Sequence, residues 1–154
     1  PPGYGCMLKQ HGLKTLSERW DKPGESLNHC MFGHIQEWFQ AYVLGIRQAP
    51  DSRGFARLLI APTPVGDLAA AKGHFDSPRG RVAVEWRRSE GAFTLSAAIP
   101  GNTAAEIVLP VPDGGTITVD GGGTEPPARR GGEGEARLTV GSGNWVFTWK
   151  APGA

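Results

Sequence analysis

The polar residues of this sequence that could do chemistry gather in one stretch, from Thr15 to His29. A carboxylate beside a tryptophan suits a sugar, because the indole can stack on the sugar while the carboxylate exchanges a proton with water. The same mixture of polar residues is typical of a solvated loop. From the residues alone, the solvated loop is the interpretation we favour. The candidates in this stretch are Glu18, Trp20, Asp21, Glu25 and His29.

Other kinds of chemistry find less support in the sequence. His29 and His34 are five residues apart, which on a helix turns them about 140° from each other. The sequence has no His-Glu-x-x-His motif, no paired Cys-x-x-Cys motifs, no nucleophile elbow and no P-loop. Cys6 and Cys30 are the only cysteines, and we expect buried thiols, with a disulfide as the less favoured alternative. We therefore expect neither a metal site nor a cofactor.

An aromatic row near the C-terminus allows a second kind of sugar contact. Trp145, Phe147 and Trp149 alternate along one face of a predicted strand, as in a sugar-stacking platform. The same alternation is typical of the core of a β-sandwich, and this is the interpretation we favour. We interpret Trp86 in the same way.

The N-terminal third of the chain is predicted to be helical in part. Apolar residues recur at spacings of three and four from Phe32 to Ile46, which predicts an amphipathic helix with one broad apolar stripe. Ser26 or Asn28 can cap its first turn, and Pro50 is expected to end it. Tyr4 to Gln10 could form the last turns of another helix, stopped at Gly12.

After Pro50 the apolar pattern has a period of two, which predicts strands. Apolar and polar residues alternate through 81–87 and again through 93–99, on either side of the turn 89–91, and this predicts a β-hairpin. Glycine and proline, 23 and 13 residues, separate the further candidates at intervals typical of an antiparallel two-sheet β-sandwich. The stretch 121–135 is predicted to be a mobile hairpin tip. The further strand candidates are 56–61, 70–75, 106–109, 116–119, 136–140 and 144–149.

Length and charge limit the possible partners. The 154 residues suffice for one domain, or for one domain and a remnant. Sixteen basic residues against fifteen acidic ones leave no excess to neutralise a nucleic acid, and no window approaches the ~18 apolar residues of a membrane helix. We expect neither a nucleic-acid nor a membrane partner, and the cysteines do not fix the compartment. Because Pro1 opens the chain in place of Met, we expect a fragment of a longer protein.

Several short motifs follow one another along about residues 3–110. They are Glu18-Arg19-Trp20-Asp21, Ser26-Leu27-Asn28-His29-Cys30-Met31-Phe32-Gly33, Glu37-Trp38-Phe39, Leu44-Gly45-Ile46, Leu59-Ile60-Ala61-Pro62, Asp76-Ser77-Pro78-Arg79-Gly80, Val84-Glu85-Trp86 and Ile99-Pro100-Gly101-Asn102-Thr103. In this order they resemble the C-terminal end of bacterial α-L-rhamnosidases of glycoside hydrolase family 78. The tail beyond Pro110 adds little to the resemblance.

The resemblance implies an architecture and an activity. Residues 1–50 would hold the last helices and an active-site loop of an (α/α)6 barrel, and residues 51–154 would form a C-terminal β-sandwich domain. The enzymes of this family release terminal α-L-rhamnose from glycosides or polysaccharides with inversion. Inversion needs one carboxyl group as acid and a second as the base that activates water. The partners implied are such a rhamnose-containing substrate and the missing part of the barrel.

The resemblance also implies roles for three residues. Glu18 matches the water-activating base, His29 matches a histidine that contacts the sugar, and Trp20 would wall the site. Ser17 stands where the family often has tryptophan, so we expect a different pocket wall. The general acid would lie outside this chain, and we expect the chain to be inactive alone.

Two alternatives remain open from the sequence. The first is a non-catalytic carbohydrate-binding or structural β-sandwich module, which would bind sugar through an exposed aromatic face. The second is another helical-barrel glycosidase, or a polysaccharide lyase, with the same domain order.

Overall fold

The chain divides into two compact units in the computed structural model. An N-terminal unit spans Pro1–Trp38 and a sandwich unit spans Phe39–Ala154. The structure describes residues 3–22, 26–112, 115–122, 128–132 and 134–152. Within these ranges no helix has both the length and the apolar character needed to cross a bilayer.

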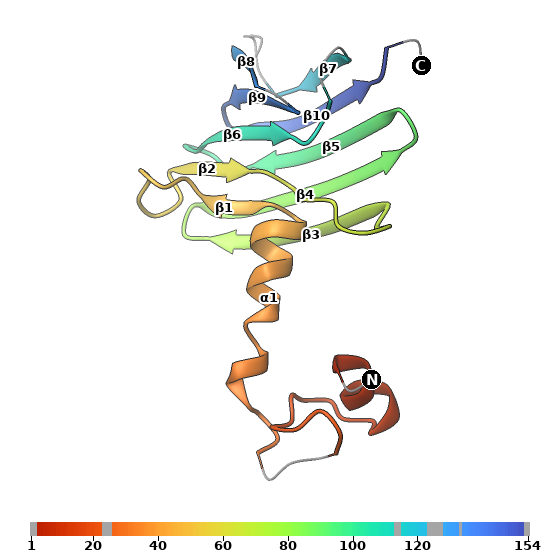
Figure 1. The fold of residues 1–154 in the computed structure, drawn as a ribbon. Helices are drawn as coiled ribbons and strands as arrows, with labels where there is room; N and C mark the ends of the chain where they lie inside the picture. The colour runs from red at the N-terminus through yellow and green to blue at the C-terminus, as the bar shows by residue number, and fades with distance from the viewer. Residues whose placement is uncertain (1–2, 23–25, 113–114, 123–127, 133, 153–154) are drawn as a thin grey trace. The chain divides into compact units, whose positions relative to one another are not determined.

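The N-terminal unit consists of short helical turns joined by irregular segments. A π-helical segment, η1, covers Cys6–Gln10 and is followed by Gly12 at a φ of 63°. A 3₁₀ turn, η2, covers Cys30–Phe32, and one α-helical turn, α1, covers Ile35–Trp38 (Figure 1). The residues between η1 and η2 form no helix or strand where they are described.

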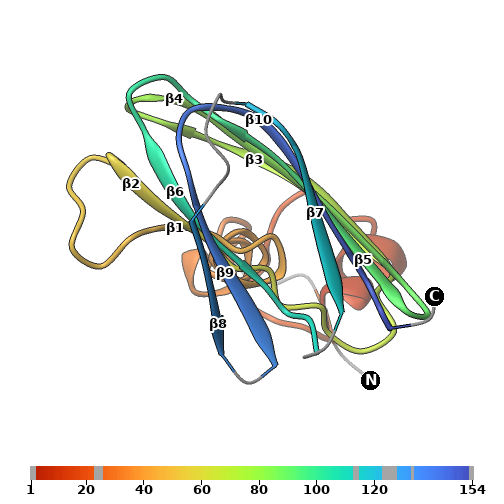
Figure 2. The same ribbon diagram turned by 90° about the horizontal axis from the view of Figure 1, so that it is seen from above.

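The sandwich unit opens with a π-helical segment, η3, over Phe39–Val43. Its described residues then form ten strands in two five-stranded sheets, ordered β1-β2-β6-β9-β8 and β3-β4-β5-β10-β7. Seen from above, the two sheets face each other (Figure 2). The strands are β1 Ile46–Gln48, β2 Arg57–Ile60, β3 Ala70–Ser77, β4 Gly80–Ser89, β5 Ala92–Ile99, β6 Ala104–Leu109, β7 Thr116–Gly121, β8 Ala128–Gly132, β9 Glu135–Val140 and β10 Gly143–Lys150.

The predicted two-sheet sandwich is confirmed, and so is its central hairpin. β4 and β5 pair antiparallel, and the apolar residue of each alternating pair points into the core. Each fully buried side chain of this kind contributes roughly 1.5–3 kcal/mol through removal of apolar surface from water. One pairing differs from the expectation of antiparallel sheets, because β2 and β6 run parallel.

The aromatic residues predicted to lie in the core are confirmed there. Trp86 and Phe147 are fully buried, and Trp145 and Trp149 keep 5% and 7% of their surface exposed. These four rings therefore offer no open face on which a sugar could stack, and the carbohydrate-binding alternative loses its predicted platform.

The predicted helix from Phe32 to Ile46 is confirmed over Ile35–Val43, where α1 continues directly into η3, and its predicted ends are wrong. Phe32 belongs to the separate turn η2, and helical structure ends at Val43 rather than near Pro50. Ile46 begins β1 instead, and its side chain is buried in the sandwich core, which explains why an apolar residue continued the helical spacing. Gly45 makes the break possible at a φ of 79°, a conformation that other residues rarely adopt.

Two strands were missed in the sequence. β1 has three residues, and β8 lies within the stretch that was predicted to be a mobile hairpin tip. β8 pairs antiparallel with β9 along its whole length. Residues 123–127 and 133 of that stretch lie outside the described residues.

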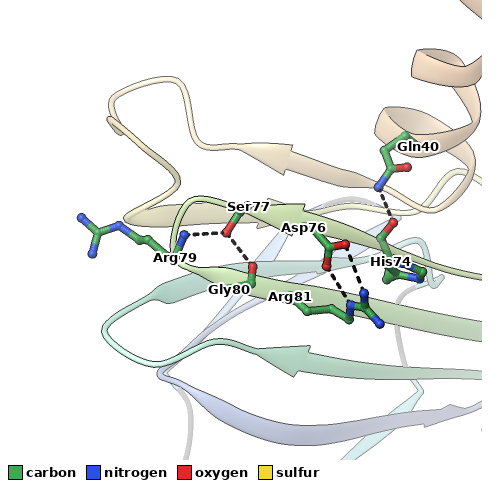
Figure 3. A network of polar contacts seen from close by, with 7 residues as sticks. All are labelled: Gln40, His74, Asp76, Ser77, Arg79, Gly80 and Arg81. Atoms are coloured by element: carbon green, nitrogen blue, oxygen red, sulfur yellow. Dashed lines mark hydrogen bonds and ion pairs between the residues drawn. The ribbon is translucent and has the colours of Figure 1, made fainter.

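Three contacts join the end of η3 to the strands of its own unit. The indole N–H of Trp86 donates to the carbonyl oxygen of Val43 at 2.7 Å. The side-chain amide of Gln40 donates to the carbonyl oxygen of His74 at 3.1 Å, on the edge strand β3 (Figure 3). Leu44 also packs close to Gly73 of β3. The core of the sandwich thus fixes the start of this unit.

Candidate functional site

Two backbone hydrogen bonds join the ends of the loop that carries the predicted catalytic and sugar-binding residues. The N–H of Glu18 donates to the carbonyl oxygen of Ser26 at 3.0 Å, and the N–H of His29 donates to the carbonyl oxygen of Leu16 at 2.8 Å. The segments of Glu18 and His29 therefore run side by side. The side chain of Glu18 is exposed and that of His29 is half-buried. An exposed carboxylate of this kind can take a proton from water.

Trp20 lies in an aromatic cluster at the base of the same loop. Its ring lies 4.1 Å from that of Phe32, centroid to centroid, and meets the ring of Tyr4 edge-on at 4.9 Å. The hydroxyl of Tyr4 donates to the carbonyl oxygen of Phe32 at 2.8 Å, which fixes the cluster. The imidazole of His29 lies 6.4 Å from the Phe32 ring. Phe32 thus has both Trp20 and His29 as neighbours.

Asp21 is exposed and interacts mainly with its own segment. Arg19 pairs with its carboxylate at 3.4 Å. Hydrogen bonds, first from the backbone N–H of Asp21 and then from Arg19, lower the pKa of this carboxyl. Asp21 is therefore held as a carboxylate and is not suited to donate a proton. Glu25, the other candidate carboxylate, lies outside the described residues.

The expectation that both cysteines are buried is wrong. Cys6 is half-buried and Cys30 is exposed, and both are free thiols. The physical reason is that the short segments η1 and η2 cover little surface, and Met7 and Ser17 are the residues of the described N-terminal unit that are fully buried. Among the residues that the structure describes, no three His, Cys, Asp or Glu side chains converge in a way that could hold a metal ion.

His11 contacts the candidate loop, although the sequence singled it out for no role. Its Nε2 atom lies 2.8 Å from the carbonyl oxygen of Asp21 and 3.5 Å from Sγ of Cys6. The sequence could not have predicted the contact with Asp21, because its acceptor is a backbone carbonyl and every residue has one.

A depression lies on the outer face of the sheet that contains β2, β6 and β9. It measures about 290 Å³ and is lined by Arg57, Glu106, Arg137 and Thr139, among others. Its charged groups are already paired, Arg137 with Glu106 at 2.9 Å and Arg57 with Asp51 at 2.5 Å. The depression therefore presents no uncompensated charge to a ligand.

Comparison with known families identifies both parts of the chain. Residues 45–124 match the model of the bacterial alpha-L-rhamnosidase C-terminal domain. Residues 1–43 match the model of the bacterial alpha-L-rhamnosidase 6 hairpin glycosidase domain. The break between the two matches falls where η3 gives way to β1.

Individual proteins and structures agree with the family models. An alpha-L-rhamnosidase of Streptomyces avermitilis is 32% identical over 96% of the chain. A crystal structure of alpha-L-rhamnosidase from that organism, complexed with L-rhamnose, superimposes with a TM-score of 0.77 at 33% identity over the same share. An alpha-L-rhamnosidase structure from Dictyoglumus thermophilum gives a TM-score of 0.76 at 28% identity over 94% of the chain. The chain spans 15% of the Streptomyces protein and 17% of the Dictyoglumus chain.

Proposed function

The chain belongs to the bacterial α-L-rhamnosidase family, and on this premise we propose that it is the C-terminal part of an inverting α-L-rhamnosidase. The complete enzyme would hydrolyse terminal α-L-rhamnose from glycosides or polysaccharides. Residues 1–50 would supply the last helices and one active-site loop of the barrel, and residues 51–154 the sandwich domain. The match of residues 1–43 to a glycosidase domain supports the barrel part of this division, and the place of β1 in a sandwich sheet favours a boundary before Ile46.

Glu18 is the general base in this proposal. An inverting hydrolase needs a carboxylate that removes a proton from the attacking water on the face opposite the leaving group. The side chain of Glu18 is exposed to solvent, and its backbone N–H is bonded to the carbonyl oxygen of Ser26. The observation that carries the assignment is this bonded loop, which brings the Glu18 and His29 segments together.

His29 and Trp20 contact the sugar in this proposal. The imidazole of His29 can donate and accept hydrogen bonds with the rhamnose hydroxyls. Trp20 presents an apolar ring that is only half-buried, which leaves part of it for a sugar. Phe32, the neighbour of both rings, fixes where they lie relative to each other.

The general acid of the reaction lies in the part of the polypeptide that precedes these residues. Inversion needs both carboxyl groups, so the 154-residue chain has no rhamnosidase activity of its own. An assay of the isolated chain with an aryl α-L-rhamnoside checks this expectation. Turnover by the isolated chain would contradict the proposal, because the base alone cannot protonate the leaving group efficiently.

The main experiment compares Glu18→Gln with Glu90→Gln in the complete enzyme. Glu90 is also exposed and lies at the β4–β5 turn, so it is a matched control for loss of one surface carboxylate. We expect Glu18→Gln to lower kcat by about 10²- to 10⁴-fold, the usual effect of removing an acid–base group. Glu90→Gln should keep normal turnover. If Glu18→Gln keeps it too, Glu18 is not the base.

The stereochemistry of the first product tests the mechanism separately. Proton NMR during the first minutes of the reaction shows which anomer forms before mutarotation. Inversion of an α-L-rhamnoside releases β-L-rhamnose. Initial release of the α anomer would mean a retaining mechanism, in which a carboxylate acts as the nucleophile and not as a base.

A further inference from the structure

We propose that His11 is a positioning residue of the candidate site. Its imidazole N–H holds the backbone carbonyl of Asp21 and so fixes the far end of the segment that begins with Glu18. This inference rests on the proposed function of Glu18. His11 touches neither the substrate nor the reacting water in this role, and it acts through the segment 18–21.

The end of η1 fixes where His11 lies. The backbone N–H of His11 donates to the carbonyl oxygen of Cys6 at 3.1 Å, and this bond closes the last turn. Gly12 then reverses the chain, and the N–H of Leu13 returns to the carbonyl oxygen of Met7 at 3.1 Å. Met7 is fully buried, so the turn that carries His11 is anchored in the interior of its unit.

The contacts of His11 also fix which nitrogen carries a proton. A backbone carbonyl oxygen can only accept a hydrogen bond, so Nε2 at 2.8 Å from the oxygen of Asp21 must be protonated. Sγ of Cys6 lies 3.5 Å from the same nitrogen and therefore faces an N–H. The thiol hydrogen of Cys6 points elsewhere, to Oε1 of Gln10 at 3.1 Å. Each of these groups thus has a compatible partner.

The segment from Glu18 to Asp21 is consequently held at both ends. The N–H of Glu18 is bonded to Ser26, and the carbonyl of Asp21 is bonded to His11. Between them, Trp20 packs on Tyr4 and Phe32. A general base works only within hydrogen-bond reach of its water, and a displacement of about 1 Å can cost up to 10²-fold in rate. Loss of the His11 bond would release one of the two ends.

The test uses His11→Leu and His11→Gln in the complete enzyme. Leucine fills a similar volume but has no N–H, whereas the side-chain amide of glutamine can place an N–H near the position of Nε2. We expect His11→Leu to lower kcat about two- to tenfold with a smaller change in KM, the range that corresponds to one hydrogen bond. His11→Gln should recover most of the lost turnover.

The pH profile separates positioning from direct proton transfer. Glutamine does not titrate between pH 5 and 8, so the His11→Gln enzyme should keep the profile of the unaltered enzyme if His11 only holds Asp21. Loss of one limb of the profile would show that His11 itself exchanges a proton in the reaction, and it would overturn the proposal. The controls are His74→Leu and His74→Gln on β3, where the contact to Gln40 uses only the backbone of His74.

The remaining outcomes are also decisive. Normal turnover in His11→Leu overturns the positioning role, and so does equal impairment of the leucine and glutamine variants, because a bulky ring and not an N–H would then be required. A thermal unfolding midpoint that stays unchanged in an impaired variant, His11→Leu above all, excludes misfolding as the cause of its lost turnover. The Glu18→Gln variant distinguishes failure of this proposal from failure of the Glu18 assignment. If Glu18 is not the base, Glu18→Gln stays active whatever the His11 variants do.

Discussion

The indole N–H of Trp86 donates a 2.7 Å hydrogen bond to the backbone carbonyl oxygen of Val43, across 43 residues of sequence. Both residues are buried, Trp86 completely. The carbonyl of Val43 belongs to the last turn of η3, and at the end of a helix such carbonyls lack a partner within the helix itself. A core tryptophan therefore supplies a hydrogen bond that the helix cannot make.

Replacing Trp86 with phenylalanine should lower the free energy of unfolding by more than the smaller ring alone would. The variant removes the N–H and leaves the Val43 carbonyl buried without this donor, at a cost of about 1–3 kcal/mol. Trp149→Phe is the matched control, because its Nε1 is also buried but no described residue accepts a hydrogen bond from it. Urea unfolding of the chain measures both variants. Equal losses in the two would mean that the Val43 bond contributes nothing.

Local periodicity predicted those elements whose side chains follow one pattern. β4 and β5 alternate strictly, because one face of each strand meets the core and the other meets solvent. β1 and β8 lack such a pattern. The first has three residues, and the second is defined by its antiparallel backbone pairing with β9, which no alternation of residue types announces. The parallel pairing of β2 with β6 joins strands that are distant in sequence, so no local pattern of residue types could predict it.

The candidate site was predicted by a different route. Glu18, Trp20 and His29 stood out because their types suit a sugar and because their motifs resemble a known family; their roles remain predictions. Backbone bonds between Leu16 and His29, and between Glu18 and Ser26, show that the loop closes on itself. The contact of His11 with Asp21 could not be predicted, since its acceptor is a backbone carbonyl and its donor is separated from it by ten residues.

Gly45 is expected to tolerate no side chain. It has a φ of 79°, and a Cβ atom placed on it would lie 2.3 Å from the carbonyl carbon of Ala61 and from the nitrogen of Pro62. Both are backbone atoms, so β1 and the chain after β2 would have to move apart. Gly45→Ala should therefore lower the free energy of unfolding by more than about 4 kcal/mol, the range of severe backbone and packing defects.

Gly54 provides the control for the conformational part of this effect. It has a φ of 55°, but a Cβ atom added to it would meet no atom of a more distant residue within 4 Å. Gly54→Ala should cost only the backbone strain, about 1–2 kcal/mol. Thermal unfolding of both variants tests the comparison. Similar losses at the two glycines would show that the close approach of Ala61 and Pro62 relaxes without cost.

The ion pair between Asp76 and Arg81 should make stability depend on pH at the acid end. Two hydrogen bonds join the groups, at 2.7 and 3.1 Å (Figure 3). These hydrogen bonds from Arg81, and then its positive charge, lower the pKa of Asp76 from its ordinary value of 3.8. Because the pKa is lower in the folded chain, the contribution is present above pH 3.8 and is lost as pH falls through the lower folded value.

Asp76→Asn should therefore lower the urea midpoint near neutral pH and leave it almost unchanged at the most acidic pH. Arg81→Gln should do the same, because either substitution breaks the pair. Both groups are exposed, so the effect should be small and should shrink further in concentrated salt. A difference between variant and original chain that persists at acid pH would assign the effect to packing and not to charge.

Arg79 holds two loops at one end of the sandwich. Its Nε donates to the carbonyl oxygen of Gly54 at 3.1 Å and its Nη1 to that of Asn102 at 3.2 Å. The turn that carries Arg79 is itself fixed by Ser77, whose hydroxyl accepts from the N–H of Arg79 and donates to the carbonyl oxygen of Gly80 (Figure 3). Phe55 and Asn102 both have positive φ, so the two loops contain backbone that needs such support.

Arg79→Lys should loosen these loops without unfolding the sandwich. A lysine ammonium lacks the planar fork with which arginine reaches two carbonyls at once, so at least one bond is lost. Each bond contributes about 0.5–1.5 kcal/mol, which corresponds to roughly two- to tenfold faster opening. Hydrogen exchange of the Ala104 amide, bonded to the carbonyl oxygen of Ala56 between the two loops, should accelerate by that factor. The Leu95 amide in the centre of β5 should exchange as before, because global unfolding governs it; if both amides accelerate equally, Arg79 stabilises the whole sandwich and not its loops.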